Sequence, residues 1–332
     1  MEKTIVAAVQ AAPVFLDRDA TVDKACALIA EAAGNGAGLV AFPEAFVPGY
    51  PDWVWRTPAW HDGEFAQRLY AGAIEIGSPA AGRLADAAAG SGVYVAIGVN
   101  ELDGGTLYNT LLYFAPDGTL VARHRKLMPT GGERTIWGMG DGSTLGVVTT
   151  PFGVVGGLIC WENYMPLARA AMYAQGVTIY LAPTWDNSEV WVPTLRHIAK
   201  EGRVYVLGVA PVLHGGHVPQ ELRGDLYAGT GDWMSRGHSA IAGPDGQLIA
   251  GPVTDTEEIL YAEADPRAVL AARREFDPVG HYARPDVFHL SVDTTPRRPV
   301  SFLAVDDSPR RLRADAPGPF RIACRSGRMP FV

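Results

Sequence analysis

The chain has 332 residues, of which 48% are hydrophobic and 19% are charged; this composition excludes a disordered polypeptide and supplies a large buried core. The formal net charge of −8 and the lack of any Lys and Arg block in the body of the chain argue against a nucleic-acid-binding surface. No apolar run approaches the ~20 residues of a membrane span, and we expect residues 4–10 to form a first strand rather than a signal peptide.

The cysteine content points to a reducing compartment. An odd number of cysteines cannot form a fully paired disulfide framework. Cys26 lies in a helical stretch and is expected in the core, so it gives no sign of pairing. We therefore predict a soluble, cytoplasmic protein with neither a nucleic-acid nor a membrane partner. The three cysteines are Cys26, Cys160 and Cys324.

The first third of the chain alternates predicted strands and helices. A helix over residues 21–33 should begin near Asp19 or Thr21, and Ser78 should cap a second helix that ends near residue 89. A long loop rich in Pro and Trp, residues 43–58, precedes the second helix. Strands are expected over residues 4–10, 38–42 and 93–99.

Two predicted hairpins share the same turn sequence. They turn at Pro-Asp-Gly, residues 116–118 and 244–246, which is a common turn sequence. The helix and strand alternation around each also repeats, which suggests two similar halves: two β-sheets packed face to face with helices outside. The remaining expected elements are hairpins over residues 107–124 and 240–250, strands over 153–159, 177–182, 204–210 and 257–262, and a helix near 193–202.

The C-terminal part loses its periodicity from about Asp277 and becomes rich in Pro and Arg. We predict one domain over residues 1–276 and an extension over residues 277–332 that contributes to oligomer contacts. Prolines and Asp315 accompany the basic residues, so a solvated or partner-contacting tail is favoured over a polyanion-binding patch. The basic residues of this tail are Arg310, Arg311, Arg313, Arg321, Arg325 and Arg328.

Cys160 follows an apolar run, residues 153–159, that has the length and branching of a core strand. Asn163 is a possible helix cap, and Pro166 suits a first helical turn. Cys160 is thus expected on a sharp strand-to-helix turn, where backbone N–H dipoles favour a nucleophilic thiolate. The alternative is that Cys160 is a small buried apolar side chain.

Two further polar residues come at the ends of predicted strands. Glu44 is flanked by apolar residues, and desolvation raises the basicity of such a carboxylate, as suits a general base. Lys126 leaves a hairpin strand for a long loop, where an ammonium can stabilise a developing anion. Alone, each has a plain explanation as an exposed loop residue. Because strand ends from separate parts of a chain meet at one edge of a sheet, Glu44, Lys126 and Cys160 together predict a base, a charge stabiliser and a nucleophile.

These segments resemble the motifs of the nitrilase superfamily, and within it the nitrilase branch. Residues 42–44 (Phe-Pro-Glu), 126–130 (Lys-Leu-Met-Pro-Thr) and 157–163 (Gly-Leu-Ile-Cys-Trp-Glu-Asn) resemble its glutamate, lysine and cysteine motifs. The resemblance implies a four-layer α-β-β-α sandwich that pairs across a dimer interface. It also implies Glu44 as base, Lys126 as stabiliser and Cys160 as nucleophile, with Glu133 near this triad. Further matching segments are residues 49–51, 133–138, 182–185 and 281–286.

The resemblance implies hydrolysis of a carbon-nitrogen bond without a metal or an organic cofactor. Trp161-Glu162-Asn163, the Trp53-Val54-Trp55 loop and residues 281–286 favour a nitrile as the small-molecule substrate. An amidase or carbamoylase with the same triad is the alternative, and a catalytically silent scaffold is a more distant one. We expect a homo-oligomer built from dimers, which can extend into open spirals. The eight histidines show no metal-ligand spacing.

Aromatic residues next to the motifs predict the substrate pocket. Tyr50, Trp161 and Trp185 are expected to line an apolar cavity, with core packing as the alternative. Three other tryptophans are assigned to the pocket, to a lid or to a partner surface: Trp53, Trp55 and Trp60.

Overall fold

The computed structural model describes residues 1–229, 231–297 and 300. Cys324 and the six arginines of the C-terminal tail lie outside the described residues, so the predictions about them stay predictions. Within the described part of the chain, no helix is both long enough and apolar enough to cross a membrane.

In the described chain the first β-sheet has six strands. Their bounds are Thr4–Gln10 (β1), Ala37–Ala41 (β2), Tyr94–Asp103 (β3), Thr106–Phe114 (β4), Leu120–Arg125 (β5) and Glu258–Ala264 (β13). They lie in the order β13-β1-β2-β3-β4-β5. β1, β2 and β3 are parallel, and β4 is antiparallel to both β3 and β5. β5 therefore runs in the direction of β2, and both strands end at the same edge of the sheet.

The second β-sheet has seven strands within the described residues. Their bounds are Val148–Thr150 (β6), Gly153–Gly157 (β7), Ile179–Pro183 (β8), Tyr205–Val209 (β9), Val212–His214 (β10), Trp233–Ala242 (β11) and Leu248–Thr254 (β12). The order is β10-β11-β9-β8-β7-β6, and β12 also pairs with β11. β7, β8 and β9 are parallel and end at one edge.

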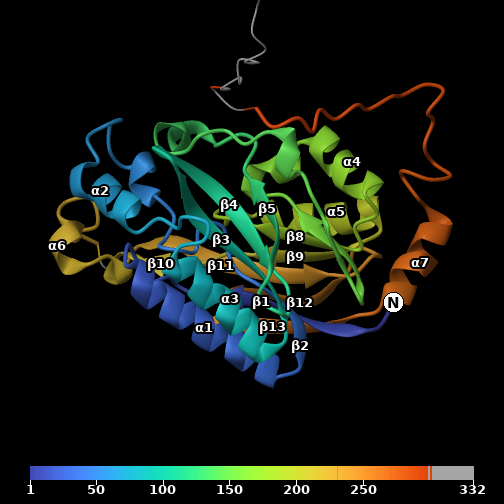
Figure 1. The fold of residues 1–332 in the computed structure, drawn as a ribbon, viewed down its shortest axis with the longest axis horizontal. Helices are drawn as coiled ribbons and strands as arrows, with labels where there is room; N and C mark the ends of the chain where they lie inside the picture. The colour runs from blue at the N-terminus through green and yellow to red at the C-terminus, as the bar shows by residue number, and fades with distance from the viewer. Residues whose placement is uncertain (230, 298–299, 301–332) are drawn as a thin grey trace, which may run out of the picture. The chain divides into compact units, whose positions relative to one another are not determined.

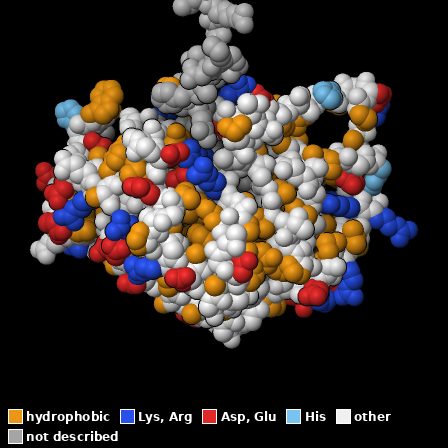
Figure 2. Space-filling view, viewed as in Figure 1, with side chains coloured by type: hydrophobic (Ala, Val, Ile, Leu, Met, Phe, Trp, Pro, Cys, Tyr) orange, Lys and Arg blue, Asp and Glu red, His pale blue; other side chains and the backbone are white. Residues whose placement is uncertain are grey.

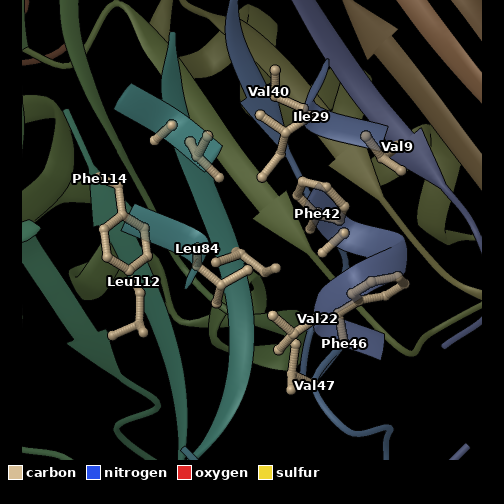
Figure 3. Packing of buried hydrophobic residues seen from close by; sticks show 14 of the residues in the cluster. Val9, Val22, Ile29, Val40, Phe42, Phe46, Val47, Leu84, Leu112 and Phe114 are labelled. Carbon is tan, nitrogen blue, oxygen red and sulfur yellow. The ribbon is translucent and has the colours of Figure 1, made fainter. Parts of the chain in front are cut away.

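Helices cover the outer face of each sheet (Figure 1). The helices α1 (Arg18–Gly34) and α3 (Pro79–Ser91) pack on the first sheet, and α4 (Pro166–Ala174) and α5 (Trp191–Gly202) pack on the second. Figure 3 shows Ile29 of α1 and Leu84 of α3 among Val40 of β2 and Leu112 and Phe114 of β4, two strands of the first sheet. The apolar stripe of each helix is thereby removed from water, which is the main stabilising contribution of such a layer.

A separate core joins the inner faces of the two sheets. Leu39 of β2 and Ala96 of β3 belong to the same buried cluster as Val155 of β7, Ile179 of β8 and Leu207 of β9. The layers are therefore helix, sheet, sheet and helix, so the predicted four-layer sandwich is confirmed. Pairing of two subunits across a dimer interface stays a prediction.

The local turn and cap signals were mostly confirmed. Gly118 and Gly246 both have left-handed φ angles, of 82° and 83°, in the two Pro-Asp-Gly turns, and glycine accommodates that conformation without a steric cost. Ser78 caps α3 by accepting from the backbone N of Ala81 at 3.3 Å. The predicted start of the first helix was wrong: α1 begins at Arg18, because Asp17 accepts from the backbone N of Ala20 at 3.0 Å.

The last described part of the chain has no regular secondary structure. Residues 277–297 form neither helix nor strand, and the backbone N of Arg297 donates to Asp141 Oδ2 at 2.6 Å. The division between a domain and an extension at residue 276 stays a prediction.

On the face seen in Figure 2, acidic and basic side chains are interspersed and no patch of one sign dominates. The other helices are α2 (Gly63–Ala71), α6 (Gln220–Arg223) and α7 (Pro266–Glu275), and the short 3-10 helices are η1 (Asp52–Trp55), η2 (Gly131–Thr135), η3 (Gly142–Thr144), η4 (Cys160–Tyr164) and η5 (Gly215–His217).

Candidate active site

Lys126 lies between two buried carboxylates. Its Nζ is 2.7 Å from Glu44 Oε1 and 2.8 Å from Glu133 Oε2, and each of the three residues is only 1% exposed. Lys126 directly follows β5, and Glu44 lies three residues after the end of β2. The two strand ends at one edge of the first sheet thus bring the carboxylate of Glu44 and the ammonium of Lys126 into contact.

Both oxygens of Glu44 are held in place. Asn109 Nδ2 of β4 donates to Oε1 at 2.7 Å, and the backbone N of Trp185, just after β8, donates to Oε2 at 2.7 Å. Gly98 of β3 permits this arrangement, because a Cβ there would lie 2.2 Å from the carbonyl oxygen of Pro43. The Glu44 carboxylate therefore has a fixed orientation and bridges the two sheets.

Glu133 is held by its own helix start and by an aromatic ring. Its Oε2 accepts from the backbone N of Thr130 at 2.6 Å, while its Oε1 accepts from the Tyr50 hydroxyl at 2.6 Å. Trp55 Nε1 in turn donates to the Tyr50 oxygen at 3.1 Å. The second carboxylate thus connects the ammonium to aromatic residues outside the charged cluster.

Cys160 is the first residue of η4 and lies on the sharp turn that follows β7. Its φ of 53° is left-handed, which is uncommon for a residue other than glycine, and it is 4% exposed. Gly157, the last residue of β7, allows β8 to lie close to this strand, since a Cβ at Gly157 would lie 1.9 Å from the carbonyl oxygen of Leu181. The predicted turn after a core strand is confirmed, although β7 ends at Gly157 rather than at residue 159.

Asn163 is not a helix cap, so that prediction was wrong. α4 begins at Pro166, and Met165 precedes it. The Asn163 amide instead donates to the carbonyl oxygens of Leu158 and Cys160, each at 2.9 Å. Its Oδ1 accepts from the Tyr180 hydroxyl at 2.8 Å. The side chain therefore stabilises the turn that carries the thiol.

Burial sets the protonation of the cluster. It raises the pKa of Cys160, and the charges of Glu44 and Glu133 raise that pKa further, against the opposing charge of Lys126. The expected thiolate is therefore wrong for the free site, where the thiol is protonated, because desolvation outweighs the backbone dipoles. The pKa of Glu44 is also raised, as predicted, because the effect of burial exceeds the opposing effect of the Lys126 charge.

The pKa of Lys126 has the opposite balance. Burial lowers it, but the charges of Glu44 and Glu133 raise it, and the net pKa lies above the ordinary lysine value. The ammonium therefore stays charged at neutral pH despite being buried, because two carboxylates compensate its lost hydration.

A cavity of about 460 Å³ opens onto Cys160. The structure places Tyr50, Trp161 and Trp185 in its wall, as expected for a pocket next to the motifs. The rings of Tyr50 and Trp185 stack with centroids 4.3 Å apart, and Trp161 Nε1 donates to Asp186 Oδ2 at 2.9 Å. The lining residues are Tyr50, Trp55, Thr130, Glu133, Cys160, Trp161, Trp185, Asp186, Asn187 and Ser188.

The three tryptophans of the first loop have different places. Trp55 lines the cavity and is half exposed. Trp53 is completely buried and packs against Phe15 and Phe65, so its assignment to a pocket, lid or partner surface was wrong. Trp60 is 84% exposed and is not among the lining residues.

Sequence reasoning missed several polar residues at the site. Asn109 lies on β4 between Leu107 and Leu111, and an amide in this apolar stretch is the one signal that could have found it. Thr130 contributes a backbone N–H, which leaves no trace in the sequence. Among the described residues, no group of three or more His, Cys, Asp or Glu is arranged to hold a metal ion.

The arrangement therefore combines two buried carboxylates, a buried ammonium and a thiol that borders an aromatic cavity. The family model for carbon-nitrogen hydrolases matches residues 5–274. The chain belongs to the carbon-nitrogen hydrolase family. The predicted membership of the nitrilase superfamily is thus confirmed, and the chemistry of the family is the hydrolysis of carbon-nitrogen bonds.

Individual relatives agree with the family assignment. The chain is 48% identical to an aliphatic nitrilase of Sinorhizobium fredii, over 90% of this chain and 99% of that protein. It is 46% identical to Nitrilase blr3397 of Bradyrhizobium diazoefficiens, over 89% and 94% of the two chains. The structure of Nit3 from Saccharomyces cerevisiae, a member of branch 10 of the nitrilase superfamily, aligns with a TM-score of 0.66 at 22% identity, covering 85% of this chain and 97% of that one. This last likeness shows the shared fold.

Proposed function

We propose that the chain hydrolyses an organic nitrile to the carboxylic acid and ammonia, with Cys160 as nucleophile, Glu44 as general base and Lys126 as charge stabiliser. The observation that carries this proposal is the fully buried contact of Lys126 with Glu44 and Glu133 beside the Cys160 thiol. The names of the two relatives above, both nitrilases, support the choice of a nitrile.

The first half of the reaction forms a covalent intermediate. Glu44 takes the thiol proton as the sulfur of Cys160 adds to the nitrile carbon, and the nitrogen receives a proton to give a thioimidate. Lys126 stabilises the negative charge that develops on the nitrogen, with the backbone N–H of Trp161 as a second donor. Because the free thiol is protonated, deprotonation accompanies the attack rather than preceding it.

The second half releases the products. A water that Glu44 activates adds to the thioimidate carbon, ammonia leaves, and a thioester remains. A second water, again activated by Glu44, breaks the carbon-sulfur bond, frees the acid and restores the thiol. Glu133 acts through Lys126, whose ammonium it contacts at 2.8 Å.

The cavity favours a mid-sized nitrile with an apolar or aromatic group over free cyanide. Its volume of about 460 Å³ lies within the range of small-molecule sites. Tyr50, Trp161 and Trp185 offer apolar contact area, at about 25 cal/mol per Å² buried. That contribution is available to a phenyl or alkyl group and not to cyanide.

A substrate panel tests the proposal. Acid, amide and ammonia would be quantified for phenylacetonitrile, benzonitrile, a short dinitrile, cyanide and the amides that correspond to the organic nitriles. We expect the highest kcat/KM for an organic nitrile. Faster turnover of the amides would identify an amidase instead, and cyanide as the best substrate would contradict the pocket assignment. A chain that hydrolyses none of these compounds, and whose Cys160 thiol stays unmodified after incubation with a nitrile or iodoacetamide, would be a catalytically silent scaffold.

We further propose a cytoplasmic homo-oligomer assembled from dimers. The free thiols of Cys26 and Cys160 suit a reducing compartment. Family resemblance supplies the expectation of dimer pairing, and the segment after Asp277 supplies a candidate contact.

A further inference from the structure

A buried ion pair lies beside the triad and has no place in the mechanism above. His124 Nε2 is 2.9 Å from Glu162 Oε2, and both residues are 1% exposed. His124 comes two residues before Lys126, and Glu162 comes two residues after Cys160. The pair thus joins the two chain segments that carry the ammonium and the thiol.

The carboxylate of Glu162 also holds the backbone of both segments. Its Oε1 accepts from the backbone N of Leu127 at 2.6 Å, directly after Lys126. Its Oε2 accepts from the backbone N of Ile159 at 2.7 Å, directly before Cys160. One side chain therefore links the end of β5 in the first sheet to the end of β7 in the second sheet.

We propose that Glu162, supported by His124, is a positioning residue that fixes the separation between the Lys126 ammonium and the Cys160 thiol. This inference rests on the proposed function, because it concerns the geometry of those two groups. Neither Glu162 nor His124 lines the cavity around Cys160, so the pair acts through the backbone of its neighbours rather than on the substrate.

The ring of His124 has an acceptor on each side. Its Nδ1 lies 3.2 Å from the carbonyl oxygen of Thr144, and its Nε2 faces the carboxylate. A carbonyl only accepts hydrogen bonds, so both ring nitrogens carry protons and the pair is an imidazolium and a carboxylate. Burial lowers the pKa of His124, but the charge of Glu162 and these hydrogen bonds raise it above the ordinary value. Burial raises the pKa of Glu162, but His124 and the backbone donors lower it overall.

A carboxylate is required by the number of donors. Three N–H groups, from Leu127, Ile159 and His124, converge on two oxygens of Glu162. An amide at this position has one oxygen, and its NH₂ group would face either the N–H of Leu127 or that of Ile159. Whichever way the amide turns, one backbone donor beside a site residue loses its acceptor, and a buried unsatisfied donor is costly. That segment must then move to find another partner.

A purely structural brace and a positioning residue predict different kinetics. A brace lowers stability when it is removed but leaves the folded fraction as active as the wild type. A positioning residue changes the reaction within the folded protein, because small misplacements of reacting groups are costly to rate. The substrate contacts are unchanged, so the loss should appear in kcat more than in KM.

The test compares Glu162→Gln with Glu101→Gln in the full-length chain. Glu101 is an equally buried carboxylate, but it accepts from the side chains of Thr110, Arg123 and Arg125. For folded Glu162→Gln we expect kcat to fall by about 10- to 100-fold, and KM to stay within about threefold. The rate of Cys160 alkylation by iodoacetamide should also change by about fivefold or more, whereas Glu101→Gln should match the wild type in all three quantities.

Folded Glu162→Gln with wild-type kcat and wild-type alkylation would overturn the inference. If this variant does not fold, His124→Gln is tested instead. It removes the imidazolium but keeps the carboxylate of Glu162, which still accepts from the backbone N of Leu127 and of Ile159. We expect a kcat loss of about 3- to 10-fold there, and an unchanged kcat would equally overturn the inference. Absence of nitrile turnover by the wild-type chain would instead contradict the proposed function, and the alkylation rates would still report on the position of the thiol.

Discussion

The hydroxyl of Tyr50 donates a 2.6 Å hydrogen bond to Glu133 Oε1, while the other oxygen of this carboxylate contacts Lys126 at 2.8 Å. Tyr50 also stacks on Trp185 in the cavity wall. The substrate-facing wall and the buried ammonium are therefore joined through a single carboxylate. Changes to either ring or carboxylate should consequently reach the reacting groups.

Glu133→Gln should lower kcat by about 10- to 100-fold without unfolding the protein. The amide removes one of the two negative charges that compensate Lys126, so the ammonium is held less firmly. Steady-state kinetics and thermal unfolding would measure the two effects. Tyr50→Phe, which deletes one donor to the same carboxylate, should give a smaller loss. Near wild-type kcat for folded Glu133→Gln would show that Glu133 is only structural.

Cys160→Ala should reduce turnover to less than about 1% of the wild type while the fold persists. The substitution removes the covalent route and leaves only positioned groups. Cys26→Ala is the matched control and should keep most of the activity, because Cys26 is half-buried in α1 and outside the cavity lining. Residual activity of several percent in Cys160→Ala would contradict the assignment of the nucleophile.

Asn109→Leu should move the acid limb of the kcat/KM profile to higher pH. Burial raises the pKa of Glu44, and the hydrogen bond from Asn109 partly offsets this. A general base acts when deprotonated, so activity is lost as the pH falls through the pKa of Glu44, and loss of the hydrogen bond raises that pKa. Thr110, the next residue along β4, donates to Glu101 rather than to Glu44. Thr110→Val should therefore leave the acid limb in place. An unshifted limb in Asn109→Leu would mean that another group sets it.

The His124 and Glu162 pair should contribute to stability within a defined pH window. The pKa of His124 is raised on folding, so its contribution is complete below about pH 6.5 and is lost as the pH rises through the folded-state pKa. The pKa of Glu162 is lowered, so its contribution is complete above about pH 4.3 and is lost as the pH falls through the folded-state pKa. Burial raises the pKa values of Tyr113 and Tyr180, and the charge of the Glu162 carboxylate raises both further.

His124→Leu should therefore lower the free energy of unfolding by about 3–5 kcal/mol near pH 5.5. The difference from the wild type should shrink at alkaline pH, where the wild-type imidazolium is lost. Denaturant titrations at several pH values would measure both. A difference that is constant with pH would show that the pair is not ionised in the folded chain.

Truncation after Asp286 should reduce the size of the assembly, as seen by light scattering. Residues 287–292, which follow directly, expose the apolar side chains of Val287, Phe288, Leu290 and Val292, and such a patch marks a protein contact. A contact between different surfaces of neighbouring subunits extends into a filament when it does not close. The full-length double variant Val287→Ser and Phe288→Ser should shrink the assembly in the same way. A strictly monomeric wild-type chain under active conditions would exclude this arrangement.

Local signals were sufficient for most of the fold. The two Pro-Asp-Gly turns and the Ser78 cap depend on neighbours within a few residues, so the sequence predicts them directly. The start of α1 was wrong by a small shift because Asp17 and Asp19 both suit a helix start, and only Asp17 bonds the backbone N of Ala20. Long-range contacts, by contrast, have no local trace.

The site shows the same limit. Asn163 has the side chain of a good cap, but Tyr180, 17 residues away, and the carbonyls of the turn take its hydrogen bonds instead. The thiolate was wrong because the dipole argument considers one turn, whereas the pKa of Cys160 depends on complete burial by two sheets. The contact of Trp185 with Glu44 spans 141 residues and involves a backbone N–H, which no side-chain pattern encodes.

That last hydrogen bond has a consequence for how the chain reaches its working state. Glu44 and Lys126 follow strands of one sheet, while Cys160 and the Trp185 backbone N–H follow strands of the other. Neither sheet alone contains a complete reaction centre, however well its strands have formed. During refolding, the recovery of enzymatic activity will therefore report when the two sheets pack together. Activity will return later than the circular dichroism signal of the strands and helices.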